Sequence, residues 1–118
     1  MQGFRKLKVF QRSHAPAVEI RKLAAGFPSS GYGKFKNQIT DAAGSIATNI
    51  VEGAGASSKE EFARFLEMSI KSSLELEYRI QLAFDYGLIG SALWERLTRE
   101  AIEIRKMLFG LKKAVLAE

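Results

Sequence analysis

The sequence predicts an all-α domain that folds as an antiparallel, up-down-up-down four-helix bundle. In four successive segments, apolar residues recur at spacings of three and four, which is the period of one face of an α-helix. Short breaks rich in glycine, proline or serine separate these segments, and such short connections place consecutive helices antiparallel. No strand-like alternation is present, so residues 1–118 are expected to form a single helical domain.

The first predicted helix runs from about Leu7 to Gly26. Its expected buried stripe consists of Phe10, His14, Ala17, Ile20 and Ala24. Pro16 is unusual there, because a proline beyond the first turn of a helix costs about 3 kcal/mol. Either Ser13 caps a helix that begins there, or the helix begins earlier and kinks near Arg12. The apolar residues before Arg12 favour the kink.

The second predicted helix presents one apolar face and ends at residues 53–56. The face consists of Phe35, Ile39, Ala42, Ala43, Ile46 and Ile50. Small residues at Gly44, Ser45 and Ala47 predict that a neighbouring helix approaches closely.

The third predicted helix begins with a capping box, in which Ser58 accepts the N–H of Glu61 and the Glu61 side chain reaches back. Gly87 ends it. Its expected core positions are Phe62, Phe65, Leu66, Ser69, Ser73, Leu76, Ile80 and Ala83. On its outer face, three acids each precede a base by four residues, the favourable order for an ion pair: Glu60–Arg64, Glu67–Lys71 and Glu75–Arg79.

The fourth predicted helix carries a coiled-coil-like seam and a second apolar stripe. The seam consists of Leu97, Ala101, Ile104, Leu108, Leu111 and Val115. The second stripe consists of Trp94, Ile102, Phe109 and Leu116. Two interpretations of the stripe stay open: it widens the buried arc of a bundle helix, or Trp94 and Phe109 form an interface between subunits.

The residue types exclude most kinds of catalytic centre. The chain has no cysteine and a single histidine, His14, so thiolate chemistry is excluded and neither a zinc site nor another metal or cofactor site is expected. His14 is expected to be a partly buried structural residue. Asp41, Asn49 and Glu52 lie among small and apolar residues and are interpreted as buried hydrogen-bonding ties. The glycines before Lys59 lack the spacing and the preceding strand of a nucleotide-binding loop.

The chain carries a formal net charge of +5, with much of the excess near its start. A basic surface favours binding to phosphates, although it also serves to keep a protein in solution. No signal-peptide core and no membrane-spanning segment is evident, so the expected location is the cytoplasm, with no membrane partner.

Three segments resemble the bacterial four-helix-bundle family named after proteins encoded in intervening sequences of large-subunit ribosomal RNA. They are residues 4–14, residues 38–53 and residues 58–66. The second contains Ser-Ile-x-x-Asn-Ile-x-Glu-Gly and the third contains Glu-Phe-x-Arg-Phe-Leu. By position, the family signature falls on Asn49, Glu52, Gly53, Phe62, Arg64 and Phe65.

This resemblance implies a four-helix bundle that assembles into a ring-like homopentamer and has no known catalytic activity. A related group of bundles serves as accessory factors to reverse transcriptases and binds nucleic acid through a basic surface. In the signature, Asn49 and Glu52 are expected to supply hydrogen bonds, Gly53 a positive-φ exit from the second helix, and the two phenylalanines the core. The chain departs from the family pattern at Phe10, where tryptophan is usual, at Pro16, and in a 54–58 loop that lacks basic residues.

The leading hypothesis is a non-catalytic, homo-oligomeric protein that binds the backbone of RNA or DNA. The cations expected to make the contacts are Arg5, Lys6, Lys8, Arg12, Lys34, Lys36, Lys112 and Lys113. The alternative is a protein–protein scaffold or accessory subunit, for instance of a nucleic-acid enzyme, whose basic surface only keeps it in solution.

Overall fold

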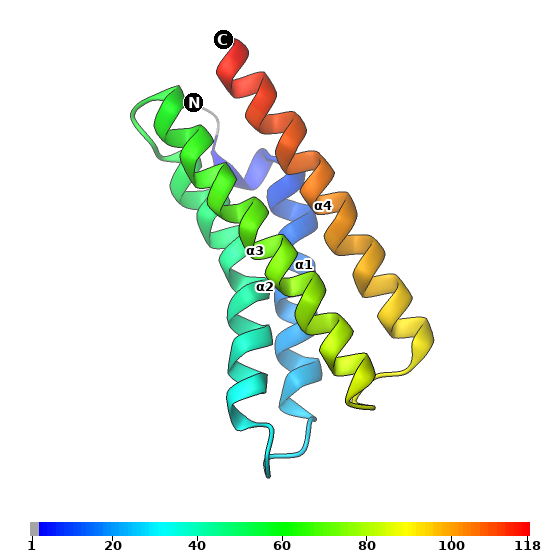
Figure 1. The fold of residues 1–118 in the computed structure, drawn as a ribbon. Helices are drawn as coiled ribbons and strands as arrows, with labels where there is room; N and C mark the ends of the chain where they lie inside the picture. Colours follow the sequence, from blue (N-terminus) through cyan, green and yellow to red (C-terminus); the bar gives the residue numbers. More distant parts are fainter. Residues whose placement is uncertain (1–2) are drawn as a thin grey trace.

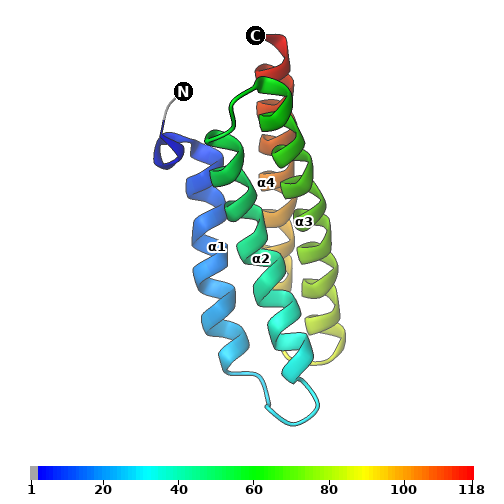
Figure 2. The same cartoon turned by 90° about the vertical axis from the view of Figure 1, so that its left-hand side faces the viewer.

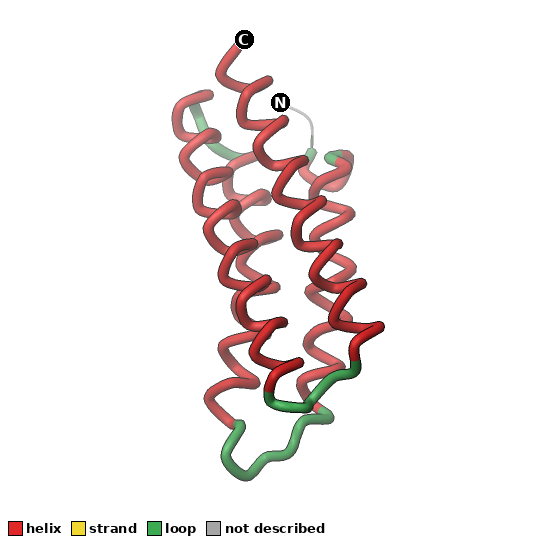
Figure 3. Tube along the Cα trace, turned by 45° about the vertical axis from the view of Figure 1, so that its right-hand side comes forward, coloured by secondary structure: helices red, strands yellow, loops and turns green. Residues whose placement is uncertain are grey.

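The computed structural model describes residues 3–118 and confirms the predicted four-helix bundle (Figures 1 and 3). Residues 1 and 2 of the predicted domain lie outside the described part of the chain. A short 3-10 helix precedes four long helices: η1 (Phe4–Lys6), α1 (Lys8–Ala25), α2 (Gly33–Ala54), α3 (Lys59–Asp85) and α4 (Ser91–Ala117). Within residues 3–118 there is no strand, and no helix is long and apolar enough to cross a membrane.

The helices alternate in direction, so both chain ends lie at one end of a rod about 48 Å long (Figures 1 and 2). The α1–α2 and α3–α4 connections lie at the other end. α3 packs extensively against both α2 and α4, whereas α1 meets α4 at far fewer points. The molecule is therefore held most firmly along α2, α3 and α4, with α1 packed mainly on α2.

The apolar faces predicted for α2 and α4 form the core. All six predicted positions of α2 are buried. On α4, five of the six seam residues are buried, and Leu111 is partly buried. Seven of the eight core positions predicted on α3 are also buried; Phe65 is the exception and lies half-buried.

The buried face of α1 differs from the predicted stripe. The residues it buries are Val9, Ser13, Pro16, Ile20 and Ala24. Ser13 can be buried because its hydroxyl donates a hydrogen bond to the Val9 carbonyl at 2.7 Å, so it is no helix cap. The helix begins before Pro16, as expected. The prediction that His14 is partly buried is wrong, because its ring lies exposed and stacks on Phe10 at 5.6 Å.

The turn from α2 to α3 combines confirmed and incorrect predictions. Ser58 caps α3 as predicted, accepting the Glu61 N–H at 3.1 Å, but the Glu61 carboxylate accepts the Ser57 hydroxyl at 3.4 Å. Gly53 has no positive φ and lies inside α2, so its predicted exit role is wrong. Its buried position instead leaves room for α3: a Cβ atom there would lie 2.8 Å from Cδ1 of Phe62.

Serine hydroxyl groups join α2 to α3, and Asn49 forms a hydrogen bond within α2. Ser69 donates to the Ile46 carbonyl at 2.7 Å, and Ser72 and Ser45 share a hydrogen bond at 2.9 Å. Asn49 donates to the Ser45 carbonyl at 2.8 Å, which confirms its predicted tie.

Two of the predicted ties are wrong. Asp41 and Glu52 are exposed and form no hydrogen bond through their side chains within residues 3–118, because they point off the α2 face that packs on its neighbours. Of the small residues expected to let a neighbouring helix approach, Ser45 contacts Ser72 of α3, whereas a Cβ atom at Gly44 would meet nothing within 4 Å. Gly87 ends the turn after α3 with φ of 76°, as predicted.

Candidate nucleic-acid interface

Three exposed cations lie near the start of the chain, on η1 and at the beginning of α1. Arg5 and Lys6 belong to η1, and Lys8 is the first residue of α1. The Gln11 side chain donates to the Arg5 carbonyl at 2.9 Å, and the Arg5 guanidinium lies 4.7 Å from the centre of the Phe4 ring. None of the three cations forms an ion pair with a residue of the described chain. Their charges are therefore open to solvent and to an anionic partner.

Arg12 has a different role, because its guanidinium is engaged by a carboxylate. It donates to both oxygens of Glu100 on α4, at 2.9 and 3.3 Å. The hydrogen bond and the charge of Glu100 raise the pKa of Arg12 above its ordinary value. Arg12 thus fastens α1 to α4, and binding a phosphate would require it to leave Glu100.

Of the predicted pair near the end of α4, only Lys113 forms no ion pair within residues 3–118. Lys112 forms an ion pair of 2.6 Å with Glu67 on α3, and this contact lowers the pKa of Glu67. The sequence had predicted that Glu67 pairs with Lys71, and this prediction is wrong because Glu67 pairs with Lys112. Of the three ion pairs predicted along α3, only Glu75–Arg79 is formed, at 3.7 Å.

The structure does not bring all of the predicted cations together. Lys34 and Lys36 lie in the first turn of α2, at the end of the bundle opposite to η1 (Figure 2). A helix rises about 1.5 Å per residue, so the length of α1 separates the two groups by roughly 27 Å. Arg5, Lys6 and Lys8 share one end with Lys113, and Lys34 and Lys36 belong to another surface.

Phe109 and Trp94, the predicted interface pair, differ in exposure. Phe109 is 53% exposed, and Leu116 on the same stripe of α4 is 45% exposed. Trp94 is half-buried: its ring stacks on Phe84 at 4.9 Å and its Nε1 donates to Gln81 at 3.1 Å. Trp94 therefore already has partners inside the protomer, whereas Phe109 and Leu116 offer free apolar surface.

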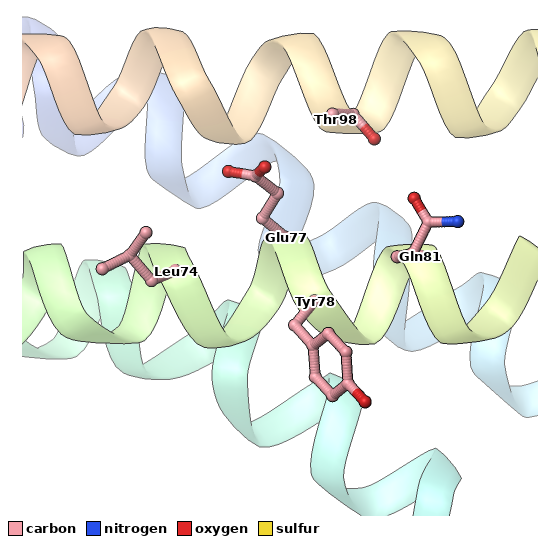
Figure 4. A pocket seen from close by; sticks show the side chains of 5 residues that line it. All are labelled: Leu74, Glu77, Tyr78, Gln81 and Thr98. Atoms are coloured by element: carbon pink, nitrogen blue, oxygen red, sulfur yellow. The ribbon is translucent and has the colours of Figure 1, made fainter.

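A groove lies between α3 and α4 (Figure 4). It encloses about 250 Å³ and is lined by Leu74, Glu77, Tyr78, Gln81 and Thr98. Glu77 accepts a hydrogen bond from Arg105 at 2.7 Å, and the Thr98 hydroxyl is buried without a partner in residues 3–118. Leu74 and Tyr78 form an exposed apolar margin. In the described chain, no three potential ligands from His, Asp and Glu lie close enough to hold a metal ion.

Sequence reasoning missed Arg21, Asn37 and Thr40, which line a polar cleft with Lys36 between α1 and α2. The three residues belong to two different helices and to no recognised motif. Only the helical spacing of Lys36 and Thr40, one turn apart on α2, hints that they share a face. Arg21 lies beside Lys36 and Thr40 because of the way α1 is aligned along α2, and the sequence does not reveal this alignment.

The comparisons with known proteins agree with this architecture. The comparison with curated proteins finds no match. The chain is similar in structure to a protein with unknown function from the S23 ribosomal protein family of Bacteroides thetaiotaomicron. The two share 28% sequence identity with a TM-score of 0.80, over 89% of this chain and 95% of the other. The family model of the 23S rRNA-intervening sequence protein matches residues 5–110. The chain therefore belongs to the 23S rRNA-intervening sequence protein family.

Proposed function

We propose that this protein is a non-catalytic, homo-oligomeric bundle of the cytoplasm that binds the phosphate backbone of RNA through Arg5, Lys6, Lys8 and Lys113. The observation that carries the proposal is the N-terminal group of three exposed cations without a carboxylate partner in the described chain. Such a surface neutralises phosphates without contacting base edges, so binding is sequence-independent, salt-sensitive and open to DNA as well.

Several observations support a binding role in place of catalysis. His14, the one histidine of the chain, is exposed, lies against Phe10 and does not line the α3–α4 groove that holds Glu77. Glu77 in that groove is occupied by Arg105. The names of the family and of the similar structure refer to ribosomal RNA and to a ribosomal protein, which favours RNA over other polyanions.

The proposed assembly places Phe109 and Leu116 between subunits, with five subunits as the number that the family resemblance implies. Both residues are about half exposed in the protomer. Burying apolar side chains stabilises an interface by roughly 25 cal/mol per Å² of apolar area. Assembly would also repeat the N-terminal cations around the oligomer and raise the affinity for a long polyanion, because several weak contacts act together.

A second candidate function is a protein–protein scaffold, for example an accessory subunit of a nucleic-acid enzyme. The exposed Leu74 and Tyr78 beside the α3–α4 groove favour it, since exposed aromatic and aliphatic side chains next to a hollow are typical of protein-binding surfaces. In this case the basic end would contribute only to solubility.

The test is fluorescence anisotropy with generic RNA over a salt series, using a double charge reversal. In Lys6→Glu/Lys8→Glu we expect the affinity at low salt to fall at least tenfold and the slope of log affinity against log salt to decrease by roughly two. Both residues are exposed, and Lys8→Glu places an acid at the start of α1, where the helix dipole favours it. The fold is therefore expected to persist.

The matched control is Lys71→Glu/Arg99→Glu, which changes the net charge equally on exposed positions of α3 and α4. It should weaken binding less than threefold. The proposal is wrong if the wild-type protein binds RNA more weakly than about 0.1 mM at low salt, where non-specific binders are strong. It is equally wrong if both double variants lose affinity to the same extent, because binding would then follow net charge alone.

A further inference from the structure

The loop that joins α1 to α2 lies at the end of the bundle away from the chain termini (Figure 2). A cleft is found between these two helices, on the turns of each that lie towards this loop. It encloses about 190 Å³ and is lined by Arg21, Ala24, Ala25, Lys36, Asn37 and Thr40. The small side chains of the two alanines leave the hollow open. Its other four residues are all hydrogen-bond donors.

Lys36 is held in position at this cleft. Its ammonium group donates to the Phe27 carbonyl at 3.1 Å, and the residue is half-buried. Phe27 is itself buried, with its ring stacked on Phe35 at a centroid distance of 6.2 Å. An ammonium group has three N–H donors, so two remain after this hydrogen bond. The charge of Lys36 is thus fixed beside the cleft with donors to spare.

The electrostatic surroundings leave the cleft positive. No acidic residue lines it, and neither Arg21 nor Lys36 forms an ion pair within residues 3–118. Glu19, the one acidic residue within Lys8–Ala25, forms an ion pair with Arg96 of α4. The first turn of α2 also has no acid and no side-chain cap, so the positive end of the α2 dipole adds to the field.

We propose that this cleft binds a phosphate group. Side chains that carry a guanidinium, an ammonium, an amide and a hydroxyl group line one hollow between two helices, and a phosphate offers several strong acceptor oxygens to such donors. The phosphate can belong to a small phosphorylated molecule or to a nucleic-acid backbone. The site is independent of the proposed RNA-binding surface, which lies at the opposite end of the bundle.

The test is a titration of the ¹⁵N-labelled protein with pyrophosphate at constant ionic strength, followed by NMR. We expect saturable shifts at the amides of residues 21–25 and 33–40. Arg21→Gln should weaken binding about tenfold, the size of one charge-assisted hydrogen bond. The matched control Lys22→Gln removes the same charge from the next residue, which does not line the cleft, and should change the affinity less than twofold.

Thr40→Val adds a test that leaves the charge unchanged, and it should weaken binding about threefold through the loss of one neutral donor. Neither Arg21 nor Thr40 forms a side-chain hydrogen bond in the described chain, so both variants are expected to fold. The proposal is overturned if the shifts stay linear in pyrophosphate concentration. It is also overturned if Lys22→Gln weakens binding as much as Arg21→Gln, since the effect would then come from the overall charge.

The source of the phosphate is decided by repeating the RNA measurement with Arg21→Gln. If this variant loses affinity for both pyrophosphate and RNA, the cleft holds a nucleic-acid phosphate. If it loses affinity for pyrophosphate alone, the ligand is a small phosphorylated molecule. The two proposals are tested with different variants. Lys6→Glu/Lys8→Glu tests the RNA-binding surface, and Arg21→Gln tests the cleft, so that one proposal can fail while the other holds.

Discussion

The missing side chain of Gly53 allows α3 to pack against α2. A Cβ atom at this position would lie 2.8 Å from Cδ1 and 3.2 Å from Cε1 of Phe62, and 3.0 Å from Cβ of Phe65. Phe62 is buried, and a Cβ atom moves only with its backbone, so neither neighbour gives way easily. The family signature thus joins Gly53 to the two phenylalanines through a shared contact between helices.

Alanine at Gly53 is therefore expected to destabilise the protein by about 1–3 kcal/mol, the usual cost of overpacking a core. The matched control is Gly44→Ala in the same helix, where a Cβ atom meets nothing within 4 Å. Replacing a mid-helix glycine without a clash should stabilise by roughly 0.5–1 kcal/mol. Urea unfolding of both variants measures the difference, and a Gly53→Ala variant as stable as Gly44→Ala would show that the helices are less tightly packed here.

The signature residues show what the sequence can predict about single positions. The spacing of Asn49 along α2 correctly placed it among packed residues, and its amide finds Ser45 on the same helix. Glu52 belongs to the same motif but is exposed. Whether a side chain is buried and finds a partner depends on where the neighbouring helix lies. Gly53 was correctly singled out, but its role depends on the distance between α2 and α3, which no spacing along the chain contains.

Among the elements, α1 has few contacts with α4. It meets α4 through two ion pairs between their flanks, Arg12 with Glu100 and Glu19 with Arg96. Its buried face includes Ser13 and Pro16. Hydrophobic periodicity does not recognise these two residue types as core, which is why the predicted stripe of α1 was rotated from the observed one. The stripes of α2 and α4 consist of apolar side chains and were predicted almost completely.

Acid should weaken the attachment of α1. The hydrogen bond from Arg96 lowers the pKa of Glu19 in the folded protein. In the unfolded chain this carboxyl group has the ordinary glutamate pKa of about 4.3. The stabilisation is thus present above this unfolded value and is lost as the pH falls through the lower, folded value. In Glu19→Gln we expect a loss of about 0.2–1 kcal/mol at pH 7, typical of an exposed pair, and a smaller loss at pH 3.

Urea midpoints of the wild type and Glu19→Gln at the two pH values measure this difference. Glu52→Gln is the control, because Glu52 is exposed and has no ion-pair partner in residues 3–118. Its stability relative to the wild type should hardly change between pH 7 and pH 3. If Glu19→Gln is destabilised equally at both pH values, its ionised carboxylate is not what attaches α1 to α4.

For the whole molecule, the bundle topology decides which cations act together. Arg5 and Lys113 are far apart in the sequence but share one end of the rod, whereas Lys34 lies at the other (Figure 1). The sequence predicted the residue types of a basic surface and the helices that carry them. It could not separate free cations from Arg12 and Lys112, because their carboxylate partners belong to other helices and only the packed structure brings them together.

The proposed assembly should depend on the outer stripe of α4. Phe109 is 53% exposed, and placing a charge there would leave it facing the apolar surface of the next subunit, which is unfavourable when the interface closes. We expect Phe109→Asp to dissociate the oligomer into protomers of 13.1 kDa, as measured by light scattering. Because Phe109 is exposed in the protomer, the substitution should leave the helical circular dichroism unchanged.

Two controls separate this interface from a general effect of surface substitution. Val18→Asp introduces the same charge at a 42% exposed position on α1 and should leave the assembled mass unchanged. Trp94→Phe removes the hydrogen bond to Gln81 and should lower stability by about 1 kcal/mol while the protein stays assembled, because this ring is bound within its own protomer. If the wild-type protein has the mass of a single chain, the proposed assembly is wrong. If Phe109→Asp remains assembled, the interface lies on another face of the bundle.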